Sequence, residues 1–370
     1  MARHKDLNVL ILTSSPIIGR FRFQPRVDFV RLPGVAKLRR GDHVSLSLDI
    51  DLPDVLALRA SIIEHTAEAF RPHLFLVDGQ PLGLLGEIRR TLGRLKRRRD
   101  CRLVLGLHDV GEERPAPAGP SGRVPAGPAL ERLYDHVWIY GLPEVHDPVG
   151  ARGIPPKQAP RMSFAGYLGR EPRPDTPIPY EVAAMARKGP FLLVTAGGGS
   201  DGAELIDAVL SAHERFDERL PWPSLVVYGP FLPARPRAAF EQRAARLGRV
   251  TTLAFHEHLE NVMEKAAAVV CLGGYNTFCE VLSLGKRTLI VPRRAEQLQR
   301  AEAARKLGLA QVLHPDHLSP ETLVEALIQL RVQPQPATHR IPGLLGGLTQ
   351  ITETVGRWRL DGKTVRRPRA

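Results

Sequence analysis

Short apolar segments alternate with amphipathic segments along most of this chain, and this alternation constrains the fold more than any other feature. In the second half the apolar runs are 191–195, 224–228, 250–255, 268–272 and 288–291. Runs of about four to eight apolar residues bounded by turn formers are typical of buried strands. Strands that alternate with helices form parallel sheets covered on both faces. The pattern therefore predicts an α/β fold built from Rossmann-like units.

The first half repeats this alternation less regularly. Its expected strands are 9–12, 27–32, 74–77, 102–107 and 133–140, and its expected helices are 54–70 and 88–99. Stretches rich in proline and glycine interrupt the chain at 111–128 and 147–179. Since domains usually contain roughly 100–200 residues, 370 residues are expected to form two. We expect domains over 1–160 and 161–345, and a helix with a basic tail over 346–370.

Composition narrows the class of protein. No run approaches the roughly 18 apolar residues that a membrane-spanning helix needs. The three cysteines lie far apart, and His256-x-His258 lacks the spacing of a zinc helix, so we expect neither disulfides nor a bound metal. The net charge of +13 comes without a nucleic-acid-binding motif. We expect a cytoplasmic protein that binds no nucleic acid, and its charge is compatible with peripheral contact to the inner membrane face.

Three segments place special residues after expected strands, where open α/β sheets bind ligands. The first is 197–202 (GGGSDG), between a strand and a helix. Glycines let the backbone approach an anion closely, and the helix start offers N–H groups and a positive dipole end to a phosphate. The segment is neither a Walker loop nor a G-x-G-x-x-G fingerprint. On these residues alone, a phosphate loop and a tight strand–helix turn both stay open.

The second and third segments add polar side chains to the same kind of turn. In 273–280 (GGYNTFCE), Asn276 or Thr277 can bond a phosphate or cap a helix, and Glu280 can hold two sugar hydroxyls or serve in a capping box. In 292–301 (PRRAEQLQRA), Glu296 and Gln297 can bond sugar hydroxyls, and the arginines can meet phosphate. A solvated helix start is the alternative for this third segment.

Read together, these motifs are more specific than any one of them. Gly-Gly-x-Asn-Thr-x-x-Glu, an apolar stretch ending in Val-Pro, and then Glu-Gln-x-x-Arg-Ala resemble the donor-binding half of GT-B glycosyltransferases. The chain is similar to the bacterial peptidoglycan N-acetylglucosaminyl transferase family and to related predicted bacterial glycosyltransferases. The resemblance covers 190–315 and is weaker elsewhere. It implies two Rossmann-like domains with a donor site in the second.

The resemblance also implies roles for individual residues. The residues that would face the diphosphate are Gly198, Gly199, Ser200, Gly202, Gly273, Gly274, Asn276 and Thr277. Glu280 would hold the ribose, and Gln297, with Glu296 beside it, would hold the donor sugar. The backbone of His256 would pair with the nucleobase edge and Phe255 would pack near it, although Phe255 is also compatible with an ordinary core position.

This resemblance implies transfer of a hexosyl group from a nucleotide-diphosphate sugar, expected to be UDP-linked, to a hydroxyl acceptor that the sequence does not define. Such enzymes need no metal and no cofactor, because helix N-termini and backbone amides stabilise the leaving diphosphate. Two alternatives remain open. A sugar-nucleotide 2-epimerase has the same fold, and a sugar-nucleotide-binding protein would bind the donor without turnover.

The first half departs from the family pattern. In the family the first strand ends in a glycine-rich loop with a Gly-His pair, whereas here the first strand ends in 13–20 (TSSPIIGR), which resembles the second strand and loop of the family. We therefore expect an N-terminal domain without its first strand–loop–helix. His108 and Asp109 follow a strand end and are candidates for a catalytic base, with an ordinary turn capped by aspartate as the alternative.

Overall fold

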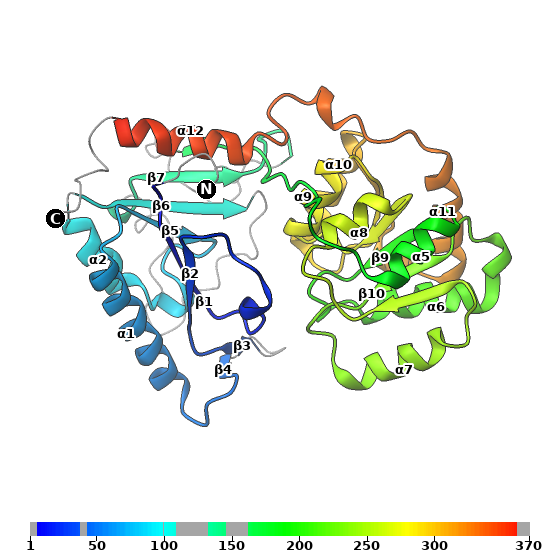
Figure 1. Ribbon diagram of the computed structural model, residues 1–370, viewed down its shortest axis with the longest axis horizontal. Coiled ribbons are helices and arrows are strands. Elements are labelled where there is room, and N and C mark those ends of the chain that lie inside the picture. Colours follow the sequence, from blue (N-terminus) through cyan, green and yellow to red (C-terminus); the bar gives the residue numbers. More distant parts are fainter. Residues whose placement is uncertain (1–5, 38–42, 99, 109–131, 146–161, 361–370) are drawn as a thin grey trace.

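The computed structural model describes residues 6–37, 43–98, 100–108, 132–145 and 162–360. Within them the chain forms two lobes that lie side by side (Figure 1). Each lobe is an α/β unit with parallel strands, as the alternation predicts. The stretch 111–128, the tail 363–370 and the expected domain boundary at 160/161 lie outside the described residues.

The C-terminal lobe is built on one parallel sheet in the order β11-β10-β9-β12-β13-β14. Its strands are β9 (Leu192–Thr195), β10 (Ser224–Val227), β11 (Val250–Leu253), β12 (Ala268–Cys271), β13 (Arg287–Ile290) and β14 (Gln311–Val312). All residues of β9, β10 and β12 are buried. Five strands match the predicted runs. The sixth, β14, has two residues, which is too short for its periodicity to show.

Helices cover both faces of this sheet because neighbouring side chains of each strand point to opposite faces. Leu193 packs in one hydrophobic cluster, whereas Leu192 and Val194 pack in another. The helices are α5 (Tyr180–Lys188), α6 (Ala203–Phe216), α7 (Ala234–Ala244), α8 (Leu259–Lys265), α9 (Tyr275–Ser283), α10 (Ala295–Lys306) and α11 (Pro320–Val332). The alternation of the five expected strands with helices predicts all of them except α5 and α11.

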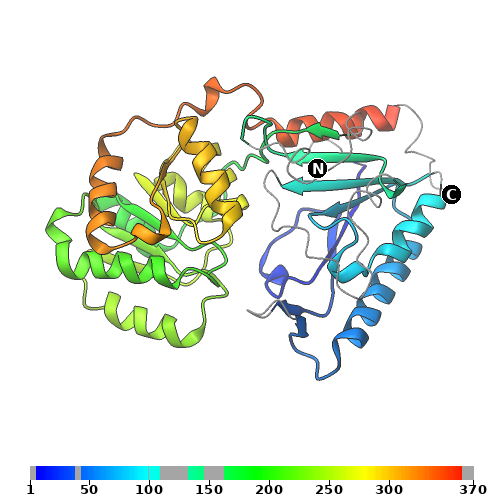
Figure 2. The ribbon, with the colours of Figure 1, turned by 180° about the vertical axis from the view of Figure 1, so that it is seen from behind.

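The main sheet of the N-terminal lobe has the order β5-β6-β7-β8, with all strands parallel. The strands are β5 (Leu74–Asp78), β6 (Arg102–His108), β7 (His136–Tyr140) and β8 (Met162–Phe164). Helices α1 (Leu52–Phe70) and α2 (Arg89–Arg97) lie on the side that faces away from the other lobe (Figure 2). Ile63, Leu92 and Leu105 meet in the core between these helices and the sheet.

Strands β1 (Val9–Thr13) and β2 (Val27–Arg31) form a separate parallel pair, and β3 (Val35–Lys37) and β4 (His43–Ser45) form an antiparallel hairpin. In the described part of the chain, no strand pairs with the second edge of β1 or of β5. All five residues of β1 are partly exposed, and Leu76 of β5 is 47% exposed. The strands of the N-terminal lobe are therefore divided between β1 and β5, whereas the absence of a first strand–loop–helix stays a prediction.

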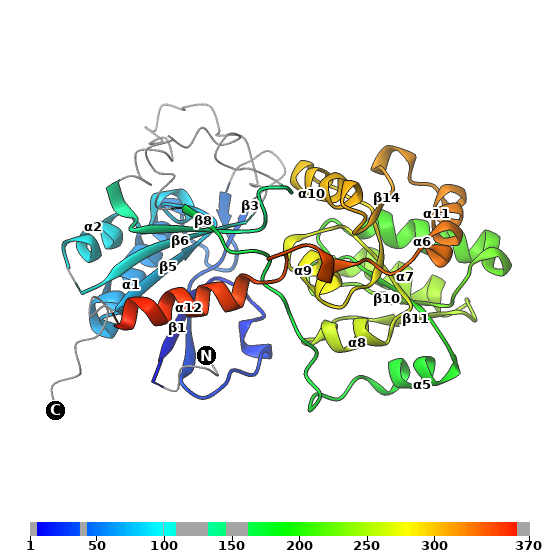
Figure 3. The same cartoon turned by 90° about the horizontal axis from the view of Figure 1, so that it is seen from above.

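The last helix, α12 (Gly347–Leu360), returns to the N-terminal lobe and lies across it (Figure 3). The ring of Trp358 stacks on Trp138 of β7 with centroids 5.6 Å apart, and the Arg102 guanidinium lies 4.4 Å from the Trp358 ring. The two chain segments that join the lobes also bond to each other, since the Tyr167 amide donates to the Leu344 carbonyl over 2.7 Å. Strand β8 follows the expected boundary at 160 in sequence, yet it extends the N-terminal sheet by pairing with β7.

Candidate donor site between the lobes

Two glycine-rich turns lie at neighbouring positions of the C-terminal sheet. One joins β9 to α6 and the other joins β12 to α9, and β9 pairs with β12. Parallel neighbours end at the same edge of a sheet, so both turns meet there. Gly199 has φ +94°, and a Cβ there would lie 2.5 Å from the Tyr228 carbonyl oxygen. Glycine is thus required at this position, and the first turn is fixed against the neighbouring strand end.

A cavity of about 460 Å³ opens at this edge. Residues from both turns, from the start of α10 and from the N-terminal lobe line it. The predicted site residues on its wall are His108, Gly198, Gly199, Ser200, Phe255, His256, Gly274, Asn276, Thr277, Glu280, Glu296 and Gln297. Glu280 and Gln297 therefore face one shared space, as the donor-site hypothesis requires. Asp109 lies outside the described residues.

Gly202 and Gly273 were expected at the diphosphate but do not line the cavity. A Cβ on Gly202 would lie 2.1 Å from the Ala196 Cβ, and a Cβ on Gly273 would lie 2.6 Å from the Ile290 side chain. Both glycines allow close packing of the backbone beneath the turns. Their role in the structure is to shape the turns rather than to face the cavity.

Glu280 is buried at 6% exposure, although its carboxylate faces the cavity. Its ion-pair partner is Arg170, whose Nη1 lies 3.4 Å from Oε1 and whose side chain is 47% exposed. Burial raises the pKa of Glu280 to about 7; Arg170 opposes this rise, and the charge of Glu260 adds to it. The first residue of α9 is Tyr275, and Gly274 precedes the helix, so Glu280 is too far along α9 for a capping box. The capping-box alternative is therefore wrong, and the carboxylate pairs with Arg170 at the wall of the cavity.

Gln297 lines the cavity and also accepts hydrogen bonds from the local backbone. Its Oε1 accepts hydrogen bonds from the amides of Arg293 at 2.8 Å and Arg294 at 3.2 Å, which fixes the start of α10. The carbonyl oxygen is thereby engaged, and the amide Nε2 is the group suited to donate to a ligand. The two arginines that the sequence offered to phosphate pair with acidic residues instead, Arg294 with Asp201 and Arg293 with Glu204.

A stack of three side chains crosses from one lobe to the other at this cavity. The ring of His108, at the end of β6, lies parallel to that of Tyr275 with centroids 4.2 Å apart. Below Tyr275, the Arg300 guanidinium lies 5.6 Å from the ring centroid, and its Nη1 donates to the Gly273 carbonyl over 3.0 Å. His108 thus faces the cavity, as predicted from its position at a strand end.

The opposite end of the cavity is also closed by the N-terminal lobe. Phe21, which follows the short 3₁₀ helix Ile18–Arg20, meets Phe255 edge to face with centroids 6.3 Å apart. The Arg20 guanidinium lies 5.8 Å from the Phe255 ring. Phe255 is half-buried and contacts the other lobe, so it is not an ordinary core residue.

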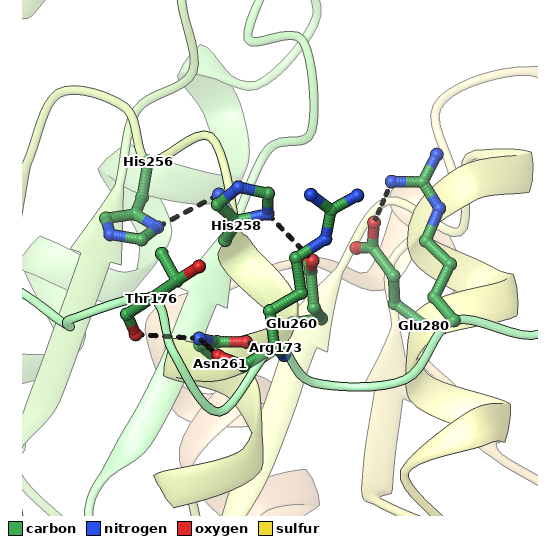
Figure 4. A network of polar contacts seen from close by, with 8 residues as sticks. Arg173, Thr176, His256, His258, Glu260, Asn261 and Glu280 are labelled. Carbon is green, nitrogen blue, oxygen red and sulfur yellow. Dashed lines mark hydrogen bonds and ion pairs between the residues drawn. The ribbon is translucent and has the colours of Figure 1, made fainter. Parts of the chain in front are cut away.

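The segment between the lobes is anchored beside the cavity. Asn261 holds it through Oδ1, which accepts from the Arg173 amide at 2.7 Å, and through Nδ2, which donates to the carbonyls of Arg173 and Thr176 (Figure 4). Ser283 of α9 accepts from the Arg170 amide at 2.9 Å. These bonds place Arg170 over Glu280.

Sequence reasoning missed several residues of this site. Tyr275 lay within a predicted motif without an assigned role, and Arg300 was expected at a phosphate rather than beneath the Tyr275 ring. Phe21, Arg170 and Glu260 lay outside the motifs. Phe21 and Arg170 reach the cavity because the N-terminal lobe and the connecting segment fold against the C-terminal lobe, whereas Glu260 reaches it from the start of α8. The signal that could have drawn attention to Phe21 is the Arg-Phe alternation of 20–23 (RFRF) after the first strand.

A second cluster of side chains has the geometry of a hydrolase triad, but it is buried where a substrate cannot reach it. His213 Nδ1 lies 2.6 Å from Asp217 and its Nε2 lies 2.8 Å from the Ser224 hydroxyl. Ser224 is 1% exposed and begins β10, so no substrate can reach it. Among the described residues, no group of three or more His, Cys, Asp or Glu side chains could hold a metal ion, and no helix is long and apolar enough to cross a membrane.

Comparisons with known proteins agree with this geometry. Residues 191–341 match the glycosyltransferase family 28 C-terminal domain. The fold is similar to that of the glycotransferase of kitacinnamycin, with a TM-score of 0.59, 16% identity, and coverage of 95% of this chain and 98% of the other. It is also similar to LpCGTa in complex with UDP, with a TM-score of 0.57, 14% identity, and coverage of 94% and 92%. A third similar structure, UGT73P12 of Glycyrrhiza uralensis complexed with glycyrrhetinic acid 3-O-monoglucuronide, has a TM-score of 0.57, 13% identity, and coverage of 96% and 90%. A search of curated proteins found no match.

The two parallel sheets and the cavity between them define the GT-B fold, which the similar solved structures share over most of the chain. Its second half is a glycosyltransferase family 28 C-terminal domain. The resemblance drawn from the motifs of the second half is confirmed at this level.

Proposed function

We propose that this chain transfers a hexosyl group from a UDP-linked sugar to a hydroxyl acceptor. The observation that carries the proposal is the shared cavity, in which Glu280, Gln297 and both glycine-rich turns face the same space. The placement of residues supports an extended donor, with the diphosphate at the turns, the ribose at Glu280 and the sugar at Gln297. A uridine donor is also supported by the UDP that one structural relative was solved with.

The chemistry follows from this placement. When the bond between the sugar and the diphosphate breaks, negative charge grows on the leaving phosphate. The N-terminus of α9, whose first residues line the cavity, and the backbone of Gly198, Ser200 and Asp201 offer N–H groups and a positive dipole end to that charge. His108 is the candidate base for the acceptor hydroxyl, since it reaches the cavity from the N-terminal lobe.

Ligand binding by the full chain tests the proposal directly. UDP should raise the melting temperature in proportion to the logarithm of its concentration, because a ligand that binds only the folded state stabilises it. Uridine should raise it much less, since it lacks the groups that the turns would hold. Turnover is then measured as release of UDP from UDP-hexoses in the presence of candidate hydroxyl acceptors. If no nucleoside diphosphate shifts the melting temperature, the proposal is wrong.

A donor-binding protein without turnover is the second candidate. The observation that favours it is the broken N-terminal sheet, where β1 is partly exposed at all five residues. The two candidates differ in one result, because only the enzyme releases UDP from a bound UDP-hexose in the presence of an acceptor.

We also propose that the chain works in the cytoplasm, in peripheral contact with the anionic inner face of the membrane. The net charge of +13 supports this contact. Binding to anionic vesicles that weakens as salt is added would test it.

A further inference from the structure

A second buried carboxylate faces the donor cavity beside Glu280. Glu260, at the start of α8, is 5% exposed and lines the same space. Its charge adds to the rise that burial causes in the pKa of Glu280, so the two carboxylates lie close enough to interact. In the function proposed above, Glu280 binds the ribose and Glu260 has no assigned role.

Glu260 is the end of a chain of polar contacts that starts at His256. The His258 amide donates to His256 Nδ1 at 3.1 Å, and His258 Nδ1 lies 3.1 Å from Glu260 Oε1. Figure 4 shows the order His256, His258, Glu260 and Glu280 along this side of the cavity. His258 is 7% exposed, and its ring orients the carboxylate through this contact. Glu260 thus lies between the loop of His256 and the carboxylate of Glu280.

An ionised carboxylate can only accept hydrogen bonds, and it has room for about four. Among the described residues, His258 is the donor that the structure shows for Glu260. Keeping a carboxylate buried with so few donors is costly, unless a ligand brings more. Beyond its phosphates, a nucleotide has two sets of hydrogen-bond donors, which are the ribose hydroxyls and the N–H groups of the base edge.

We infer that Glu260 selects the nucleobase, by accepting a hydrogen bond from a ring N–H of the base. This inference rests on the proposed function. Uracil presents N3–H and guanine presents N1–H together with an amino group, so both suit an acceptor. At the corresponding ring nitrogen, cytosine and adenine have a lone pair instead of an N–H group. This lone pair cannot donate to the carboxylate and is repelled by its oxygen atoms.

The test measures the affinity of the full chain for UDP, CDP, GDP and ADP by calorimetric titration. It compares UDP with CDP and GDP with ADP, because the bases within each pair have the same number of rings. Unpaired buried acceptors cost about 1–3 kcal/mol, so UDP should bind about tenfold or more tighter than CDP, and GDP about tenfold or more tighter than ADP. In Glu260→Gln both ratios should fall to within about threefold, because an amide both donates and accepts. Glu264→Gln is the matched control, since Glu264 lies on the same helix with its side chain 45% exposed, and it should leave both ratios unchanged.

Each result separates this inference from the proposed function. If wild-type protein binds UDP and CDP alike, or if Glu260→Gln weakens all four ligands equally, Glu260 does not read the base and the inference is overturned, whereas the proposed function stands. If no nucleoside diphosphate binds, both are overturned. The wild-type ratios need no variant, so the inference stays testable even if Glu260→Gln does not fold.

Discussion

The two lobes share one architecture and differ in how completely they are built. In the C-terminal lobe the sheet is continuous, and β9, β10 and β12 are buried along their whole length. In the N-terminal lobe the strands fall into separate sheets, β1 is partly exposed throughout, and Leu76 is 47% exposed. The same pattern of short apolar runs thus yields a closed core in one lobe and an open-edged core in the other.

This difference coincides with a division of the candidate site. The turns, Glu280 and Gln297 come from the complete sheet, while the N-terminal lobe contributes single side chains such as His108 and Phe21. A site needs rigid support to bind a ligand in one geometry. Under the proposed function, we therefore expect donor binding to depend mainly on the C-terminal lobe, and the N-terminal lobe to face the acceptor.

The largest expected contrast is in hydrogen exchange. Amides of β9 and β12 should exchange roughly 1,000-fold more slowly than those of β1, because a fully paired and buried strand exchanges only through large-scale opening. Exchange followed by mass spectrometry on the native chain measures this directly. Equal protection of β1 and β9 would contradict the comparison between the lobes.

A matched pair of leucine substitutions tests the same contrast in packing. Leu193→Ala in β9, at 0% exposure, should cost about 2–5 kcal/mol of unfolding free energy, because it leaves a cavity in a closed core. Leu76→Ala in β5 should cost less than about 1 kcal/mol, since that side chain is already half in water. Denaturant unfolding followed by circular dichroism measures both. A larger loss from Leu76→Ala would show that its face is covered in solution.

Two variants, one in each lobe, should separate binding from chemistry. Glu280→Gln should weaken UDP binding about 10- to 100-fold, because hydrogen bonds to a charged group are worth about 1.5–3 kcal/mol. His108→Ala should change UDP affinity by less than about threefold but lower turnover by about 100-fold or more, as loss of a general base does. Glu302→Gln, a partly exposed change on α10, is the control for the first variant. A large loss of UDP affinity in His108→Ala would place donor binding in both lobes.

The smallest effect is a pH dependence located in the C-terminal lobe. The pKa of Glu280 is about 7, so below that pH the carboxyl must lose a proton before it can accept both ribose hydroxyls. UDP affinity should therefore fall as the pH drops, by at most about tenfold per unit below 7, and should level off above 7. Glu280→Gln should flatten the profile. An affinity that rises at low pH would rule out this role for Glu280.

The raised pKa of Glu280 affects folding stability in the opposite direction, because it favours the folded state at low pH rather than at high pH. The folded pKa lies above the ordinary value of 4.5, so between 4.5 and about 7 the folded chain holds a proton that the unfolded chain has lost. This group's contribution therefore favours the folded state at low pH and is lost as the pH rises to about 7. Melting temperatures of Glu280→Gln and wild type across this range measure the difference.

Much of the C-terminal lobe could be predicted from the sequence, because its strands are continuous apolar runs and its helices begin after glycine turns. Strands β8 and β14 and helix α5 were missed for a local reason. β8 and β14 have three and two residues, and α5 follows a proline-rich stretch that reads as a linker. Such elements exist because their neighbours pair with them or pack against them, which periodicity does not record.

The candidate site shows the same division between sequence and structure. The motifs correctly brought Glu280, Gln297 and the two turns together, because the carboxyl ends of neighbouring parallel strands must meet. They could not distinguish Gly198, which faces the cavity, from Gly202, which packs on Ala196, since both are glycines in one turn. The motifs include neither Arg170, which the connecting segment anchored by Asn261 brings to the cavity, nor Glu260, which reaches it from the start of α8.

By itself, the sequence determined the α/β fold class and the resemblance of the second half to a glycosyltransferase C-terminal domain. Those properties depend on local sequence patterns, such as apolar runs and glycine turns, which are present before the chain folds. Only the tertiary structure decided how the lobes meet, with His108 on Tyr275 and Phe21 on Phe255, and which carboxylates share the cavity. The two ring contacts join residues more than a hundred positions apart, and the burial of the carboxylates arises only when the chain folds around the cavity.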